Sequence, residues 1–305
     1  MATTTKATSE GTLPGPHPTD QIALLGRPIR NPERVQRTFA YVLLVAGSLV
    51  FLLPFLWMVT TSLKTAKEAL SFPPQFFPSS FEWGNYRDGW TALPFTTFLM
   101  NSILLAVLCV IGNLASCILP AYAFARLRAP GKTKLFACLL ATMMVPAEVT
   151  LVPTFIMFSK LGLVNTYWPL ILPQWFGAAF FIFLLRQFMA TIPKDLDDAA
   201  RIDGASHLRT LWSILLPQMK PAIAAVTIFS FVGSWNNLIG PLIYLRSQGY
   251  YTLPLGLTFF QGQYQTQYNQ MMAVATLTLL PIIVLFFVAQ KTFVRGVTLT
   301  GMGGR

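Results

Sequence analysis

The chain has 305 residues, of which 54% are hydrophobic and only 11% are charged. Soluble domains average about 25% charged residues, so this composition excludes a soluble globular domain and indicates a helical membrane protein with several spans. The three cysteines lie inside apolar runs, and the two histidines are far apart and have no Cys or His partner nearby. We therefore expect no metal, no disulfide framework and no cofactor.

Residues 1–37 are polar, rich in Thr, Pro and Gly, and without an apolar period. They predict a disordered or loosely attached N-terminal tail. An early hydrophobic stretch followed by a small-residue cleavage site is missing, so we expect no removable signal peptide. The first span is predicted to serve as its own insertion signal.

Residues 38–293 contain long apolar runs that predict six membrane-spanning helices, followed by a short tail over 294–305. Crossing the hydrocarbon core takes about 20 apolar residues. The sixth span is separated from the preceding run by a piece rich in Gln and Tyr, 261–270, that is too polar for lipid. The predicted spans are 38–62, 97–124, 135–158, 167–190, 221–245 and 271–293. Prolines recur within them, which indicates kinks that let a bundle hinge, although proline is also simply commoner in membrane helices.

The distribution of Lys and Arg orients these spans. Of the 22 basic residues, 17 fall on the side of the N-terminus and only 5 on the opposite side. By the positive-inside rule both termini and the segment 191–217 are predicted to be cytoplasmic. The net charge of +11 is thus a topology signal, and we expect no nucleic-acid partner.

Segment 191–217 is the most charged stretch between two spans. Pro193 in a first turn, followed by three aspartates, predicts a short helix over 192–203, and Gly204 supplies a stop. A second helix is predicted with one apolar face, formed by Leu208, Leu211, Trp212 and Leu215. We call the two helices and their glycine joint the elbow. It suits either docking of a soluble partner or an amphipathic linker on the lipid headgroups.

The spacing within the elbow resembles a known family. Asp198-Ala199-Ala200, then Gly204 after three residues, then Ile214-Leu215-Leu216-Pro217 after nine more, is similar to the EAA loop of binding-protein-dependent ABC importer permeases, with Asp198 in place of the usual Glu. The stretches 121–128, 146–153, 161–167, 233–237 and 294–298 are similar to the carbohydrate-uptake branch, in particular to its six-span partner like the maltose permease G subunit.

The resemblance implies an all-α membrane protein with six transmembrane helices and the type I ABC importer permease fold. It implies a coupling helix between spans 4 and 5, a second homologous permease subunit, two ABC ATPase subunits and an extracytoplasmic solute-binding protein. The residues expected to couple to the ATPase are Asp198, Ala199, Ala200, Arg201, Asp203, Gly204, Ile214, Leu216 and Pro217. A Walker A pattern is missing from the sequence, so the chain itself is not expected to be an enzyme.

Candidate solute-path residues come from the spans. Glu148 is a lone acid in an apolar run, a costly placement that indicates either a solute contact or pairing with the partner permease. Trp235, Asn236 and Asn237 combine an aromatic ring with amides, which suits sugars but equally suits helix packing.

The outer loop from 246 to 270 is rich in Tyr and Gln. In similar permeases this loop contacts the binding protein, and the alternative is an interfacial aromatic belt. The candidate contact residues are Tyr250, Tyr251, Gln261, Tyr264 and Tyr268.

The sequence therefore predicts the permease subunit of an ATP-driven sugar importer in a prokaryotic plasma membrane. The alternatives are an ABC permease for another solute such as glycerol 3-phosphate, a secondary ion-coupled transporter, and a membrane enzyme or receptor with an amphipathic linker. The two halves of the chain share no pattern of broken segments, which weakens the secondary-transporter alternative. The enzyme alternative lacks a polar catalytic constellation.

Overall fold

The computed structural model describes residues 32–261 and 267–301. The chain divides into two compact units, 1–54 and 55–305. The division falls at Pro54, inside α1 (Pro32–Ser62), which continues past this proline. Helix α1 begins six residues before the predicted boundary of the first span, and the rest of the predicted N-terminal tail lies outside the described residues.

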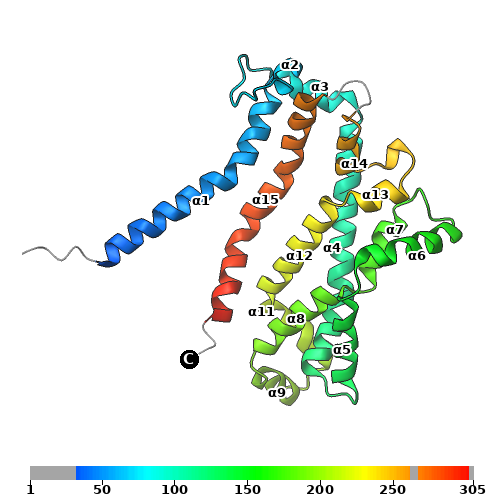
Figure 1. Cartoon of the computed structure of the whole chain (residues 1–305). Helices are drawn as coiled ribbons and strands as arrows, with labels where there is room; N and C mark the ends of the chain where they lie inside the picture. Colours follow the sequence, from blue (N-terminus) through cyan, green and yellow to red (C-terminus); the bar gives the residue numbers. More distant parts are fainter. Residues whose placement is uncertain (1–31, 262–266, 302–305) are drawn as a thin grey trace, which may run out of the picture. The chain divides into compact units, whose positions relative to one another are not determined.

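The second unit is built around α4 (Phe95–Arg126). At a rise of 1.5 Å per residue its 32 residues measure about 48 Å, which is longer than the hydrocarbon core of about 30 Å. Figure 1 shows one end of α4 beside α3 (Gly84–Ala92) and α14 (Leu253–Thr258), and the other end at the level of α5 (Lys132–Thr142). Helix α4 packs against α8 (Ala179–Thr191) and α12 (Lys220–Trp235), and so it is the central helix of this unit.

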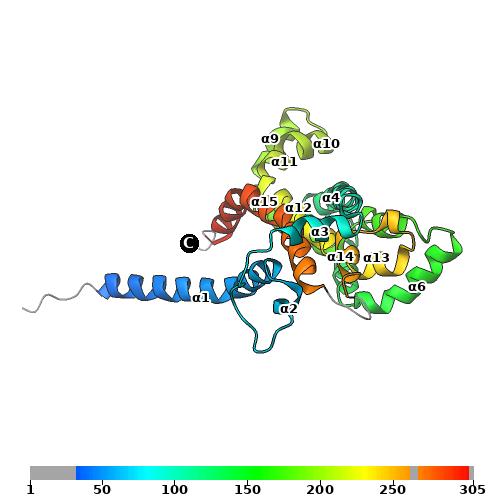
Figure 2. The ribbon, with the colours of Figure 1, turned by 90° about the horizontal axis from the view of Figure 1, so that it is seen from above.

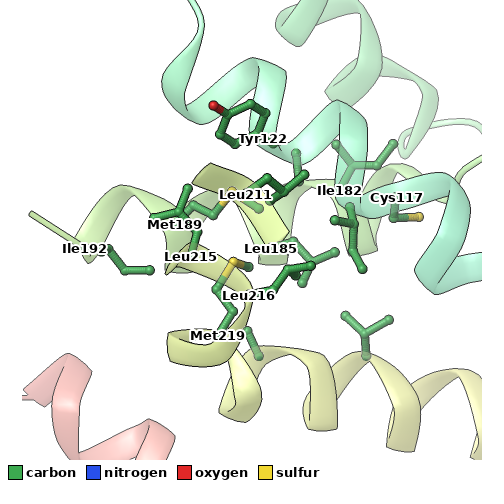
Figure 3. Packing of buried hydrophobic residues seen from close by; sticks show 14 residues of the cluster. Cys117, Tyr122, Ile182, Leu185, Met189, Ile192, Leu211, Leu215, Leu216 and Met219 are labelled. Atoms are coloured by element: carbon green, nitrogen blue, oxygen red, sulfur yellow. The ribbon is translucent and has the colours of Figure 1, made fainter. Parts of the chain in front are cut away.

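One apolar core lies where α4, α8 and the elbow meet (Figure 3). Helix α8 contributes Ile182, Leu185 and Met189, which are spaced so that they share one face. Leu211 and Leu215 of the elbow are completely buried against them. The elbow is thereby packed into the same core as α4 and α8.

A second apolar core lies at the other end of α4. Phe95 stacks on Phe260 with ring centroids 5.6 Å apart, and it meets Phe98 edge to face. Gly256 in α14 lets the helix approach this cluster, because a Cβ there would come within 2.5 Å of the Phe98 ring. This core joins α4, α12, α14 and α15 (Tyr268–Gly301).

Four segments are long and apolar enough to cross a membrane, and two bent helix pairs bring the number among the described residues to as many as six. These results confirm an all-α membrane fold. The four segments match the predicted spans 38–62, 97–124, 167–190 and 271–293, and they are Gln36–Ser62, Phe95–Arg126, Trp168–Thr191 and Tyr268–Gln290. The last helix continues to Gly301, beyond the predicted end at 293.

Three predicted spans are not continuous helices, and two of them are broken by a bend or a gap. The span predicted over 135–158 consists of α5 and α6 (Ala147–Lys160), which meet at 90°. Pro146 stands at the N-terminal end of α6, where a proline disfavours helical backbone in the residue before it. The span predicted over 221–245 ends at Trp235 and resumes only as the short α13 (Ile239–Tyr244).

Prolines elsewhere do not break the helices that hold them. Pro120, Pro153 and Pro281 lie inside α4, α6 and α15, which continue past them. The segment Trp168–Thr191 is itself composite, because α7 (Trp168–Ile171) and the 3-10 turn η1 (Leu172–Trp175) precede α8. Irregular backbone inside a span is tolerated where protein or a cavity surrounds it.

Candidate functional site

The elbow begins with α9 (Asp195–Ile202), whose first turn carries three aspartates as predicted. Pro193 lies just before this helix rather than in its first turn, since Lys194 is the N-cap residue. Gly204 adopts φ +75°, the left-handed conformation that glycine accepts without strain. The amide of Ala205 donates to the Ala200 carbonyl at 2.9 Å and closes the helix end.

The second half of the elbow is not the single amphipathic helix that the spacing predicted. It consists of α10 (His207–Thr210), the π-helical turn η2 (Leu211–Leu215) and α11 (Leu216–Gln218). Leu211 and Leu215 are fully buried, whereas Leu208 is 57% and Trp212 60% exposed. The wide π turn separates residues that a regular α-helix would have placed on one face. Figure 2 shows α9, α10 and α11 together as one group.

A buried ion pair ties α9 to the end of α4. Arg126 Nε lies 3.2 Å from Asp197 Oδ2, and the two side chains are 4% and 11% exposed. Arg126 Nη2 also donates to the carbonyl of Ile192 at 2.8 Å. Sequence reasoning missed this pair, although Arg126 stands in a stretch that carries the family resemblance. The available signal for the pair was an arginine at the end of a predicted span on the same side of the membrane as a run of aspartates.

The remaining residues of the predicted coupling set fall into two groups. Asp198, Ala199, Arg201, Asp203, Gly204 and Pro217 are exposed. Ala200 and Leu216 are buried, and Ile214 is half-buried. Asp198 Oδ1 lies 3.7 Å from Arg201 Nη1 in an exposed pair. The exposed group forms the outer surface of the elbow, and the buried group holds the elbow to the helices.

The three candidate solute residues around the end of α12 lie in different surroundings. Trp235 is 3% exposed, stacks on Phe231 and donates from Nε1 to the Thr278 carbonyl at 3.1 Å. Its ring therefore packs α12 against α15. Asn236 and Asn237 are exposed, and Asn237 accepts from the Gly240 amide at 3.0 Å.

Asn237 also lines a polar cavity of about 260 Å³ inside the second unit. Its walls come from α4, α7, η1, α8, α12, α13 and the N-cap residue of α14. Glu148 is not part of it. This acid lies in the first turn of α6, directly after the 90° bend, and is exposed, so the positive end of the helix dipole stabilises its carboxylate.

The outer loop is held by two asparagines that sequence reasoning missed. Asn101 Nδ2 donates to the carbonyls of Gly249 and Tyr251, at 2.8 and 2.9 Å. Asn165 Oδ1 accepts the amides of Arg246 and Ser247, both at 2.9 Å. Asn165 has φ +63°, a conformation in which Asn is enriched. Asn101 lies inside α4, and an asparagine within an apolar span was the available signal for it; for Asn165 the signal was an asparagine in a loop.

These anchors present part of the predicted binding-protein surface. Tyr250 is 41% exposed and meets Tyr167 edge to face at 5.2 Å. Burial, with the neighbouring Tyr250, raises the pKa of Tyr167 to about 12. Tyr251 is half-buried, stacks on Phe259 and donates to the Arg246 carbonyl at 2.9 Å.

The other candidate contact residues lie toward the end of this loop. Gln261 is exposed, and Tyr268 is half-buried at the start of α15. Tyr264 lies outside the described residues. Within 32–261 and 267–301, no cluster of His, Cys, Asp or Glu could hold a metal ion.

Helices of this length and hydropathy, with an elbow packed into their core, define a multi-pass helical membrane protein. Residues 112–299 match the family model described as the binding-protein-dependent transport system inner membrane component. The chain belongs to this family, and it is a permease of a binding-protein-dependent ABC importer.

Several relatives share about a third of its residues. The sn-glycerol-3-phosphate transport system permease protein UgpE of Pectobacterium atrosepticum is 34% identical over 85% of this chain and 94% of its own length. The arabinooligosaccharides transport system permease protein AraQ of Halalkalibacterium halodurans is 34% identical over 87% and 94%. The diacetylchitobiose uptake system permease protein NgcG of Streptomyces coelicolor is 30% identical over 88% and 89%.

The fold also matches a solved structure. A chain of a bacterial ABC transporter involved in the import of the acidic polysaccharide alginate superimposes with a TM-score of 0.73 at 24% identity. The match covers 86% of this chain and 98% of that one. The fold is thus that of an ABC importer permease.

Proposed function

We propose that this chain is one of two permease subunits in an ATP-driven importer of a sugar or related carbohydrate. Its partners are a second homologous permease, two ABC ATPase subunits and an extracytoplasmic solute-binding protein. Relatives named for arabinooligosaccharides and diacetylchitobiose support the substrate class. The setting is a prokaryotic cell membrane, with both termini and the elbow on the cytoplasmic side, as the distribution of Lys and Arg predicts.

The observation that carries the proposal is the outer surface of the elbow. Ile202, Leu208 and Trp212 are 86%, 57% and 60% exposed. Large apolar side chains rimmed by polar groups are typical of a protein interface. The exposed carboxylates of Asp198 and Asp203 beside them would be repelled by anionic lipid headgroups. This surface therefore favours a protein partner over the lipid-lying linker, and we assign it to the ATPase.

The buried side of the elbow couples it mechanically to the membrane helices. Leu211 and Leu215 are packed into the core that α4 and α8 share, and the Arg126–Asp197 pair fixes α9 to the end of α4. A well-packed core moves as a body rather than deforming gradually. A displacement of the elbow by the ATPase is therefore passed to α4, α8 and α12, whose polar side chains line the cavity.

Two other sites complete the proposed path. Glu148, at the bend between α5 and α6, faces either the solute path or a basic group of the second permease. The ordered loop 246–251, with Tyr250 at its surface, contacts the binding protein. In this proposal Asn237 contacts the solute. Trp235 supports the solute path by packing at the end of α12, and Asn236 supports it with an exposed amide.

Reconstituted vesicles test the docking surface. Trp212→Ser removes an exposed apolar group without disturbing the buried core, and it should reduce both copurification of the ATPase and ATP-driven sugar uptake. Phe81→Ser is the matched control, because Phe81 is 65% exposed but lies in the loop before α3. Full uptake by Trp212→Ser, or uptake driven by an ion gradient without an ATPase, would contradict the proposal.

Gly204, the joint between the two halves of the elbow, offers a second variant for the same assay. Gly204→Asp places a charged side chain on the docking surface, and a Cβ at this position meets no atom of the chain within 4 Å. We expect ATP hydrolysis to become uncoupled from uptake. Asn tolerates the left-handed conformation as Asp does, so Gly204→Asn controls for the added bulk.

sn-Glycerol 3-phosphate is the second candidate solute, because a relative that aligns with this chain over 94% of the relative's length is named for it. The same vesicles distinguish the two solutes. Sugar uptake that an excess of sn-glycerol 3-phosphate does not inhibit supports the sugar, and uptake of the phosphate alone supports the alternative.

A further inference from the structure

A second cavity, of about 570 Å³, lies between the C-terminal end of α4 and the elbow. Its walls come from the last residues of α4, the segment that leads into α5, and the elbow helices α9 and α10. We call it the basic cavity, because five cationic side chains line it and only two carboxylates do. The cations are Arg126, Arg128, Lys132, Lys194 and Arg201, and the carboxylates are Asp197 and Asp198. The lining therefore has an excess of positive charge.

Both carboxylates of this lining are already paired with an arginine. Asp197 Oδ2 lies 3.2 Å from Arg126 Nε, and Asp198 Oδ1 lies 3.7 Å from Arg201 Nη1. The remaining cations have no acidic partner within residues 32–261 and 267–301, and they are Arg128, Lys132 and Lys194. The excess charge of the cavity therefore resides on these three side chains.

The three side chains are accessible to a ligand and come from two walls of the cavity. Arg128 and Lys194 are exposed, and Lys132 is half-buried. Lys132 Nζ donates to the Leu127 carbonyl at 2.8 Å, which holds the ammonium group in place and leaves it further hydrogens to donate. Arg128 and Lys132 belong to the connection between α4 and α5, whereas Lys194 is the N-cap residue of α9. A ligand held by all three would bridge this connection and the elbow.

The charge and the size of the cavity restrict the class of ligand. A concave site lined by one sign of charge concentrates ions of the opposite sign. A guanidinium binds two phosphate oxygens at once, and an ammonium group binds phosphate as a point charge. Three unpaired cations exceed what a single carboxylate would neutralise. The volume lies within the range of about 300–1,000 Å³ that is typical of small-molecule sites, so an organic group fits beside a phosphate.

We propose that the basic cavity binds a phosphate ester, with Arg128, Lys132 and Lys194 holding the phosphate. The ester is the headgroup of an anionic phospholipid or a soluble compound. A lipid source is reasonable because α4 ends its membrane span at Arg126, and basic pockets at that level bind anionic headgroups. Asp203, on the outer surface of the elbow, lies outside the cavity, so its repulsion of anionic lipid does not extend to this site.

Bound phosphate would add a second connection between α9 and the end of α4, beside the Arg126–Asp197 pair. The elbow would then move less freely relative to α4 when phosphate is bound. The inference goes beyond the proposed import function, because it concerns neither the transported solute nor the docking of the ATPase. It gives the transporter a ligand site at the base of the elbow.

The reactivity of lysines reports whether the cavity is occupied. Lys132 and Lys194 line it, whereas Lys134 is exposed on α5 and lies outside the lining. The assembled transporter, in nanodiscs of zwitterionic phosphatidylcholine, is treated with sulfo-N-hydroxysuccinimide acetate, and acetylation of each lysine is quantified by mass spectrometry. Inorganic phosphate should slow acetylation of Lys132 and Lys194 severalfold, relative to chloride at the same ionic strength, and leave Lys134 unchanged.

Nanodiscs of phosphatidylglycerol without added phosphate distinguish the two sources. Protection of Lys132 and Lys194 in this lipid, with Lys134 unchanged, identifies the ligand as a lipid headgroup. Protection by inorganic phosphate in phosphatidylcholine alone identifies a soluble phosphate compound. Equal acetylation in both lipids and both anions overturns the proposal, and it is also the result expected if side chains of the ATPase fill the cavity.

A double variant tests the assigned residues. Arg128→Gln/Lys194→Gln removes two of the three cations and leaves the buried Arg126–Asp197 pair intact. Protection of Lys132 should then require about tenfold more ligand, the effect of two lost contacts between exposed charges. Lys134→Gln/Arg209→Gln is the matched control, because it removes two exposed cations, one on α5 and one in the elbow, outside the lining. Equal protection in the two double variants overturns the proposal, and ATP-driven sugar uptake remains the separate test of the import function.

Discussion

The ion pair between Arg126 and Asp197 gives a quantitative prediction about the elbow. At 3.2 Å and an effective dielectric constant of about 20, the attraction is about 5 kcal/mol, before the cost of removing both charges from water. Deleting one partner of a buried pair costs about 3–5 kcal/mol. Arg126 Nε and both carboxylate oxygens of Asp197 are buried and meet no hydrogen-bond geometry among the described residues, so the pairing is imperfect and we expect the lower end, about 3 kcal/mol for Asp197→Leu or Arg126→Met.

The double variant Arg126→Met/Asp197→Leu separates pairing from simple loss of packing. It leaves neither charge unpaired, so it should be more stable than either single variant. The assay is denaturant unfolding of the purified permease in micelles. Asp198→Asn is the control, because the Asp198–Arg201 pair is 69% and 55% exposed and exposed pairs contribute about 0–1 kcal/mol. A double variant whose loss equals the sum of the two single losses would refute the reasoning.

Three further predictions concern single positions. Burial lowers the pKa of Lys64, so between that lowered pKa and about 10.4 the native state binds fewer protons than the unfolded state. The free energy of unfolding should therefore rise with pH across this window. Lys64→Met should lack this rise when unfolding is measured as a function of pH. Gly204→Ala should destabilise by about 1–2 kcal/mol through its left-handed backbone alone, and a loss no larger than that of Ala substitutions within α9 would contradict this. Asn165→Gly keeps the backbone free but removes the amide, so binding-protein-stimulated ATP hydrolysis should fall as far as in Asn165→Ala; normal stimulation would show that the loop needs no anchor.

Composition and hydropathy sufficed for the membrane fold because about 20 consecutive apolar residues have few other uses in a chain. They did not predict whether each span forms one unbroken helix. The 90° bend between α5 and α6 depends on how Pro146 and its neighbours pack, whereas Pro120 is accommodated inside α4. The same residue type thus has opposite outcomes, and no local rule separates them.

The elbow was predictable in outline and not in its second half. Asp198, Gly204 and Pro217 have the spacing of the family's loop, and the left-handed glycine followed from the residue type. The exposure of Leu208 and Trp212 depends on the π turn, which forms because Leu211 and Leu215 are drawn into a core made by distant helices. A helical periodicity assumes one constant twist, and tertiary packing changed it here.

The polar cavity of about 260 Å³ was the least accessible to sequence reasoning. Two of its lining residues, Asn113 of α4 and Thr252 at the N-cap of α14, are 139 positions apart in the chain. Nothing in the residue type separates Asn113 from an asparagine that only bridges helices. Only the placement of Gln174 and Ser230, which accept both of its N–H groups, shows that its oxygen makes no hydrogen bond among the described residues.

The asparagines that hold the outer loop have a consequence for how this transporter diversifies. Asn101 bonds the carbonyls of Gly249 and Tyr251, and the Asn165 oxygen bonds the amides of Arg246 and Ser247. All of these partners are main-chain groups, which every amino acid except proline provides in full. Two loop side chains add to these bonds, because Asn165 Nδ2 donates to Ser247 Oγ at 2.8 Å and the Tyr251 hydroxyl donates to the Arg246 carbonyl at 2.9 Å. At the other positions the loop's shape is specified by its main chain. Its exposed surface can be rewritten to suit a new binding protein while the scaffold beneath it stays the same.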